Sequence, residues 1–289
     1  MPKIKITCDS TCDLSPELYE RYHISVIPMC VALGDRVCRD GENVEPKELF
    51  AYVEETGKLP TTSAISVGEY ADFFQPFVSE GYEVVHINLS SELSSSHQNA
   101  RIAAQETGNV YIVDSRSLST GSGHLVILGA ELASAGYDGT YIAKALDDMK
   151  GNLDVSFVLQ TLDYLHKGGR CSGIARFGAN MLKLRPEIVM ENGKLHVGKM
   201  YRGSMEKTIL DYVRGRLETA KEIQYDRICV THSGVPQEIV QKVIALVKEL
   251  CPFEEVIETV AGSTISCHCG PNCLGVLFFK KGESSQKGR

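Results

Sequence analysis

The chain has 289 residues, a length that indicates about two domains. Hydrophobic residues make up 43% and charged residues 23%, as is typical of globular proteins. Its formal net charge of −7, with no basic cluster, argues against a nucleic-acid partner, because neutralising phosphates supplies most of that affinity. No segment approaches the roughly 18 uninterrupted apolar residues of a membrane span and no signal peptide is apparent, so we expect a cytoplasmic protein without stable membrane insertion.

Strand and helix patterns alternate through the first half of the chain. Strands are predicted at residues 3–7, 24–32, 82–89 and 110–113. A helix should begin at Ser15-Pro16-Glu17, and further helices are predicted at residues 46–55, 67–79, 96–106, 119–135 and 140–150. This alternation indicates βαβ units and a mostly parallel sheet with flanking helices.

The pattern restarts near Gly151-Asn152. Strands are predicted at 155–159, 227–231, 254–259 and 274–279, helices at 162–166, 204–221 and 236–250, and a hairpin from 187–190 and 194–198 turning at Glu191-Asn192-Gly193. We therefore predict an N-terminal α/β domain over residues 1–152 and a smaller α/β domain over 153–289, whose polar tail at 280–289 should be disordered.

Small hydroxyl residues gather where predicted strands end. They fall in four loops: Asp9-Ser10-Thr11, Thr61-Thr62-Ser63, Ser90 to Ser96, and Asp114-Ser115. In open α/β sheets ligands bind beyond the carboxyl ends of the strands, and the helix that follows the Ser90 turn would favour an anion. The alternative is that these residues only cap helices.

The ten cysteines are scattered, which favours reduced, buried thiols over a disulfide framework. A metal or redox site at Cys267-His268-Cys269 and Cys273 is the main alternative function. A single residue between two cysteines is poor zinc spacing, however, and favours a cysteine-rich turn without a metal.

Two other catalytic patterns are incomplete. No Gly-x-Ser-x-Gly nucleophile elbow occurs, and His232-Ser233-Gly234 indicates a turn, although a Ser/His hydrolase is defined by geometry and stays open. Gly121-Ser122-Gly123 lacks the third glycine of a dinucleotide loop, since position 126 is Val126, and predicts close helix packing instead.

An ordered series of motifs resembles the DegV family of fatty-acid-binding proteins over nearly the whole chain. The motifs are Asp9 to Leu14, Asp40-Gly41-Glu42, Thr61-Thr62-Ser63, Ser90 to Gln98, Asp114-Ser115, Leu162 to Arg170, His268-Cys269-Gly270-Pro271 and Leu274-Gly275.

This resemblance implies a long-chain fatty acid, such as palmitate, buried between the two domains. Its carboxylate would lie near Ser63 and Ser94, with Thr62 and His268 as further contacts. Arg170 and Arg202 match positions where the family carries basic residues near the mouth of the site. The chain would then be a carrier without catalytic residues, metal or cofactor, and some relatives present the ligand to a fatty acid kinase.

The chain departs from the family pattern at the carboxylate loops. Thr62-Ser63-Ala64-Ile65-Ser66 replaces the usual Thr-Ser-Gln-Pro-Ser, and Ser90-Ser91-Glu92-Leu93-Ser94-Ser95 lacks both usual glycines. Glu92 would add a negative charge close to a bound carboxylate, which is unfavourable unless its side chain turns to solvent.

Overall fold

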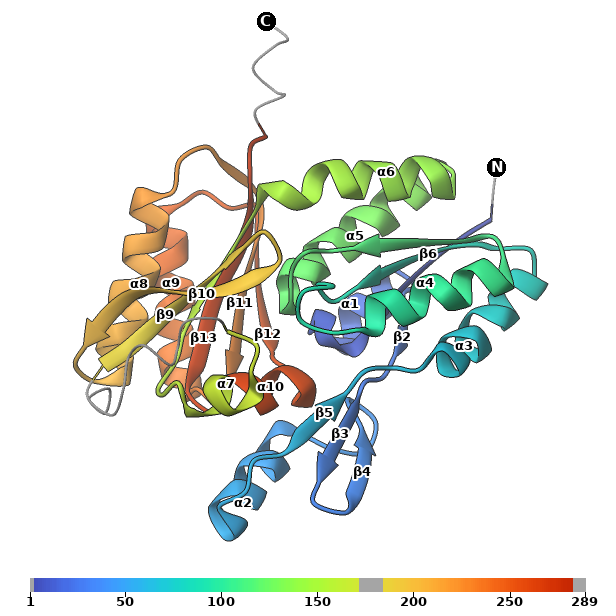
Figure 1. The fold of residues 1–289 in the computed structure, drawn as a ribbon. Coiled ribbons are helices and arrows are strands. Elements are labelled where there is room, and N and C mark those ends of the chain that lie inside the picture. Colours follow the sequence, from blue (N-terminus) through green and yellow to red (C-terminus); the bar gives the residue numbers. More distant parts are fainter. Residues whose placement is uncertain (1–2, 172–183, 283–289) are drawn as a thin grey trace, which may run out of the picture.

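The structure is a computed structural model, and it describes residues 3–171 and 184–282. Figure 1 shows two large sheets side by side, with a small third sheet at one end of the molecule. The fold is α/β, as the sequence predicts.

The first large sheet is parallel throughout. Its strand order is β2 (Ser25–Ile27), β1 (Ile4–Asp9), β6 (Glu83–Asn88) and β7 (Val110–Asp114). Helical crossovers connect the strands of a parallel sheet and place helices on both of its faces. The parallel sheet predicted for the first half of the chain is therefore confirmed.

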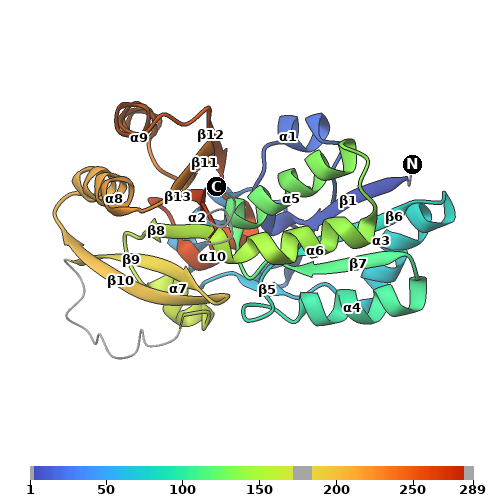
Figure 2. The same ribbon diagram turned by 90° about the horizontal axis from the view of Figure 1, so that it is seen from above.

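Apolar helix faces cover both sides of this sheet (Figure 2). On one face, α5 (Ser119–Ser134) and α6 (Gly139–Met149) pack Leu125 and Ile142 against Val85. On the other, α3 (Val67–Ser79) and α4 (Ser96–Thr107) pack Tyr70 and Ala100 against Val84. The short α1 (Pro16–Arg21) follows the 3-10 turn η1 (Ser10–Cys12), and Pro16 occupies its first turn as predicted.

The second large sheet is mixed. Its order is β10 (Lys194–Arg202), β9 (Leu184–Glu191), β8 (Leu153–Val158), β13 (Cys273–Lys280), β11 (Ile223–Ser233) and β12 (Glu255–Val260). Strands β11 and β12 are parallel, and the other neighbours are antiparallel. Helices α8 (Met205–Thr219) and α9 (Gln237–Leu250) cover one face through a single apolar cluster.

Helix α5 also contacts the second sheet, so one helix packs against both sheets. A Cβ atom on Gly121 would lie 2.7 Å from Cγ2 of Val155, and one on Gly123 would lie 2.9 Å from the carbonyl oxygen of Cys12. Only glycine permits these approaches. The close helix packing predicted for Gly121-Ser122-Gly123 is confirmed.

The small sheet corrects the predicted single strand over residues 24–32. Its strands are β4 (Arg36–Arg39), β3 (Cys30–Leu33) and β5 (Thr61–Ser63), with α2 (Pro46–Thr56) alongside. Pro28 separates β2 from β3 and offers no N–H to a sheet, so the chain leaves the parallel sheet there. The loop expected at residues 61–63 is instead the edge strand β5.

The predicted hairpin is present and longer than expected. Strands β9 and β10 meet at Asn192 and Gly193, whose φ angles are +50° and +79°. Two consecutive positive φ values are typical of the tight hairpin turn that Asn-Gly favours.

The boundary predicted near residue 152 falls in the 3-10 turn η2 (Lys150–Asn152), between the strands of the two large sheets. One apolar cluster nevertheless joins Val85 and Leu125 to Phe279 across that boundary, and the division into two domains stays a prediction. Of the polar tail predicted at 280–289, Lys280 ends β13 instead, and residues 283–289 lie outside the described part. In the described part, no helix has both the length and the apolar character to cross a bilayer.

Candidate functional site

A cavity of about 60 Å³ lies where the two large sheets and the small sheet meet. It is bounded by β5, by the segment before α4, by β10, and by the short helices α7 (Asp163–Gly168) and α10 (Ser263–Cys269). Its polar lining includes Thr62, Ser63, Ser94, Arg170 and His268. Its apolar lining includes Leu89, Leu93, Leu118, Leu195 and Ile265.

Five of the six ligand-binding residues predicted from the sequence therefore line one cavity. Arg202 does not belong to this group. It ends β10 and lines a separate depression with Lys199 and Arg214, between β10 and α8. The structure thus brings the predicted carboxylate contacts and Arg170 together, and leaves Arg202 outside.

Thr62 and His268 meet across the cavity, although they are 206 residues apart in the chain. The Thr62 Oγ1 and His268 Nε2 atoms are 3.0 Å apart. Burial, and then the nearby Arg170, lower the pKa of His268 to about 4, so the ring is neutral at pH 7. Among the described residues, the Nδ1 atom of His268 has no hydrogen-bond partner.

The Ser94 hydroxyl is held by its neighbour Ser96, which the sequence reasoning did not single out. Ser94 Oγ donates to Ser96 Oγ at 3.0 Å, and the Ser96 N–H donates back to Ser94 Oγ at 3.2 Å. Ser96 in turn accepts the Ile65 N–H at 3.3 Å. These contacts fix the position of Ser94 at the start of α4.

Two buried carboxylates from the first half of the chain hold the start of α10, the helix that carries His268. Asp40 accepts the N–H groups of Ser263 and Thr264 at 2.7 and 3.1 Å, and Asp13 accepts that of Gly262 at 2.8 Å. These carboxyl oxygens satisfy N–H groups that the first turn of a helix leaves without intrahelical partners. A Cβ on Gly262 would lie 3.1 Å from both carboxylates, so glycine permits this approach. Both aspartates occur in the motifs of the sequence, but no role could be assigned without this contact.

The cysteine segment corrects the turn expected there, because residues 263–269 form α10. Cys267 packs with Val31 and Leu49, whereas Cys269 and Cys273 pack with Leu159 and Leu165. Over residues 3–171 and 184–282, no three His, Cys, Asp or Glu side chains gather as metal ligands. The geometry therefore gives no support to the metal alternative.

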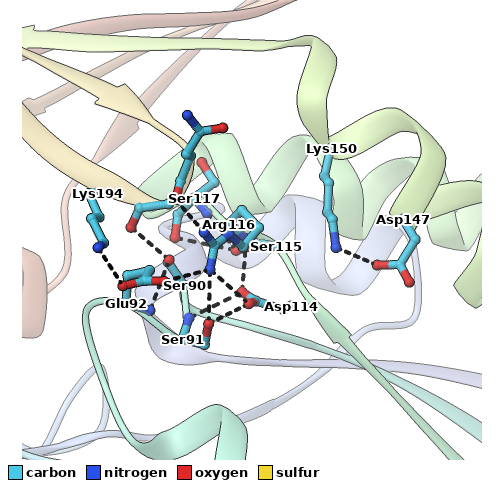
Figure 3. A network of polar contacts seen from close by, with 12 residues as sticks. Ser90, Ser91, Glu92, Asp114, Ser115, Arg116, Ser117, Asp147, Lys150 and Lys194 are labelled. Carbon is cyan, nitrogen blue, oxygen red and sulfur yellow. Dashed lines mark hydrogen bonds and ion pairs between the residues drawn. The ribbon is translucent and has the colours of Figure 1, made fainter.

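The Glu92 side chain turns away from the cavity, which is the alternative that the sequence left open. Its carboxylate lies 3.1 Å from Arg116 and 3.3 Å from Lys194 (Figure 3). Arg116, and then Lys194, hold the pKa of Glu92 below its usual value. The residue is absent from the cavity lining, so its charge is paired with these two side chains instead of facing the cavity.

A second, more apolar compartment of about 30 Å³ adjoins the first, and Leu118 and Ile265 line both. Phe157, Cys273 and Leu277 contribute to its walls. Pockets for small molecules usually measure roughly 300–1,000 Å³. Side chains nearly fill the junction, so a long ligand can enter only if they move.

Comparison of the chain with known protein families and proteins shows its family. The family model "Uncharacterised protein, DegV family" matches residues 3–281. The chain belongs to the DegV family. A DegV domain-containing protein of Caldanaerobacter subterraneus is 28% identical over 97% of this chain and 100% of its own length.

Solved DegV structures share the fold over nearly the whole chain. A DegV lipid-binding protein from Thermotoga maritima is 27% identical, covers 96% of this chain and 100% of its own, and has a TM-score of 0.84. A DegV family protein from Thermus thermophilus, described by its fatty acid binding, is 29% identical with the same coverage and TM-score. The DegV-like α/β fold predicted from the motifs is thereby confirmed.

Proposed function

We propose that this DegV protein binds one long-chain fatty acid at the junction of its sheets, with the carboxylate at Ser63, Ser94, Thr62 and His268. The observation that carries the proposal is the convergence of these uncharged polar groups on one cavity, next to an apolar compartment. Fatty acid binding by a DegV relative of similar fold supports it.

The chemistry of the lining suits an amphipathic ligand. Burying about 14 methylenes would contribute on the order of 11 kcal/mol before the costs of association. An unpaired buried carboxylate would cancel much of this gain. Hydroxyl donors and a neutral imidazole offset that cost, and the Arg170 guanidinium in the same lining adds a positive charge.

Binding requires the two compartments to merge. Leu118 and Ile265 line both, so displacement of these two side chains would join them into one tunnel. Both side chains are aliphatic, and contact with an acyl chain would replace the contacts they lose with each other and with their neighbours.

We further propose that the protein is a cytoplasmic carrier and not a catalyst, and that it presents the ligand carboxylate to a fatty acid kinase. Arg170 supports this role, because it is exposed and lines the cavity that holds the proposed carboxylate contacts. Arg202 would contribute only as part of a wider contact surface, since it lies outside the cavity.

Mass spectrometry tests the binding proposal directly. Protein purified from cells and then denatured should release about one equivalent of a long-chain fatty acid, and the stripped protein should bind added palmitate. Absence of both would overturn the proposal. The carrier role predicts that a fatty acid kinase and ATP phosphorylate the bound ligand, whereas no turnover with a kinase active on other DegV carriers would refute it.

A further inference from the structure

The tip of the β9–β10 hairpin is fastened to the segment that follows β6. The Ser90 hydroxyl donates to the carbonyl oxygen of Gly193 at 2.8 Å, and the Arg116 guanidinium donates to the carbonyl oxygen of Asn192. These two contacts join residues that are 103 and 76 positions apart in the sequence. Figure 3 shows Arg116 at the centre of this network, with Lys194 reaching toward Glu92 from β10.

An ionic cluster reinforces the same junction. Glu92 lies between Arg116 at 3.1 Å and Lys194 at 3.3 Å, and Asp114 lies 3.7 Å from Arg116. Asp114 also accepts hydrogen bonds from the N–H groups of Ser91 and Arg116, at 3.1 and 3.0 Å. Arg116 is thus oriented by groups of the first half of the chain while it contacts the hairpin of the second.

Gly193 shows how closely the two segments approach. A Cβ atom there would lie 2.7 Å from Ser90 Oγ and 2.8 Å from Arg116 Nε, closer than real Cβ atoms come to other atoms. Its φ of +79° likewise favours glycine. The turn residue therefore serves both the hairpin and this contact.

The fastened segments form one wall of the ligand cavity. Leu89 and Leu93 flank the Ser90 turn, Leu195 follows the hairpin tip, and all three line the cavity. Because that cavity measures only about 60 Å³, a long acyl chain cannot enter while this wall and its neighbours stay in place.

We propose that the hairpin tip and the Ser90 turn form a latch over the ligand cavity, and that Glu92 sets how often it opens. The inference rests on the proposed fatty acid site and adds a means of regulating exchange. The latch contacts stabilise the closed form of both the ligand-free and the ligand-bound protein. Weakening it should raise the rates of ligand entry and release together, and leave the dissociation constant nearly unchanged.

The test follows release of cis-parinaric acid, a fluorescent fatty acid, by stopped-flow displacement with excess palmitate. Exposed ion pairs contribute little individually, so Glu92→Gln and Lys194→Gln should each accelerate release roughly two- to fivefold. The acceleration in the double variant should be smaller than the product of the two single accelerations, because both changes remove the same Glu92–Lys194 ion pair. Salt at about 1 M should accelerate release from the unaltered protein more than from Glu92→Gln.

Lys207→Gln is the matched control, since it removes an exposed pair with Asp211 on α8, away from the cavity lining. Its release rate should equal that of the unaltered protein. Unchanged rates in both latch variants would refute the latch and leave fatty acid binding intact. A weaker affinity with an unchanged entry rate would also refute it, because Glu92 would then act on the bound ligand. Failure of the unaltered protein to bind parinaric acid would instead overturn the proposed function itself.

Discussion

At the scale of single residues, the hydroxyl groups that gather where strands end have different roles. Ser10 donates to Asp40, and Ser91 donates to Asp114, so these groups stabilise loops. Thr62, Ser63 and Ser94 line the cavity. Similar residues in similar loops thus have different roles, because the backbone directs their side chains to different places.

Removing the Ser94 hydroxyl should weaken fatty acid binding. A hydrogen bond to a charged group contributes roughly 1.5–3 kcal/mol, so Ser94→Ala should lower affinity about tenfold or more, and the double change with Ser63→Ala should lower it further. Isothermal titration with palmitate measures the effect. Ser95→Ala, an exposed neighbour whose side chain caps nothing, serves as the control. Unchanged affinity in the double variant would remove both serines from the site.

A buried histidine predicts how stability depends on pH. His86 is fully buried beside Thr7 and Asn88, and burial lowers its pKa to about 3. In the unfolded chain a histidine takes up a proton as the pH falls through about 6.5. The unfolded state then binds a proton that the folded state does not, so stability falls as the pH decreases from about 6.5 toward 3.

His86→Gln should therefore make stability less sensitive to acid. Between pH 7 and pH 4.5 the unaltered protein should lose about 2 kcal/mol more unfolding free energy than the variant. Urea denaturation at both pH values gives the comparison, in which the carboxylates common to the two proteins cancel. Equal losses would show that His86 does not titrate as its burial implies.

At the scale of elements, α10 depends on the first half of the chain for its position. Its first N–H groups bond to Asp40, and its side chains then supply Ile265 and His268 to the cavity. The helix has only seven residues, too few to be stable alone. Local sequence accordingly predicted a turn, and tertiary contacts made a helix.

Replacing Asp40 should destabilise α10 and displace the residues that α10 contributes to the proposed ligand site. Asp40→Asn removes the charge that faces the helix N-terminus and should cost roughly 1–3 kcal/mol of unfolding free energy. Palmitate affinity should fall as well, because His268 and Ile265 lose their support. Thermal unfolding and titration measure the two effects. Asp148→Asn, which removes an exposed carboxylate of an i,i+4 pair on α6, is the control and should change neither. Normal stability and affinity in Asp40→Asn would contradict the assigned role.

At the scale of the whole molecule, the ligand would complete a core that spans both sheets. Leu89 and Leu118 from the first half of the chain already share one apolar cluster with Phe157 and Leu195 from the second, and all four line the two compartments. A bound acyl chain would add contacts among these parts and favour the folded state by mass action.

Palmitate should therefore raise the melting temperature of stripped protein. At a free concentration of about 100 times the dissociation constant, binding adds roughly 2.7 kcal/mol, which corresponds to several degrees for a chain of this size. 1-Hexadecanol, which has the same chain without a carboxylate, should give a smaller shift, and differential scanning fluorimetry compares them. Equal shifts would show that the polar end of the cavity does not recognise the carboxylate.

The sequence by itself determined the α/β class, the parallel sheet of the first half, the long helices and the hairpin, because periodicity and turn residues act over a few positions. Its motifs also identified the family, and they predicted which residues would bind a ligand. The tertiary structure decided which of those residues meet. It joined Thr62 to His268, separated Arg202 from the cavity, and paired Glu92 with Arg116 and Lys194. These relations connect residues that are far apart in the chain, and local patterns carry no information about such distances.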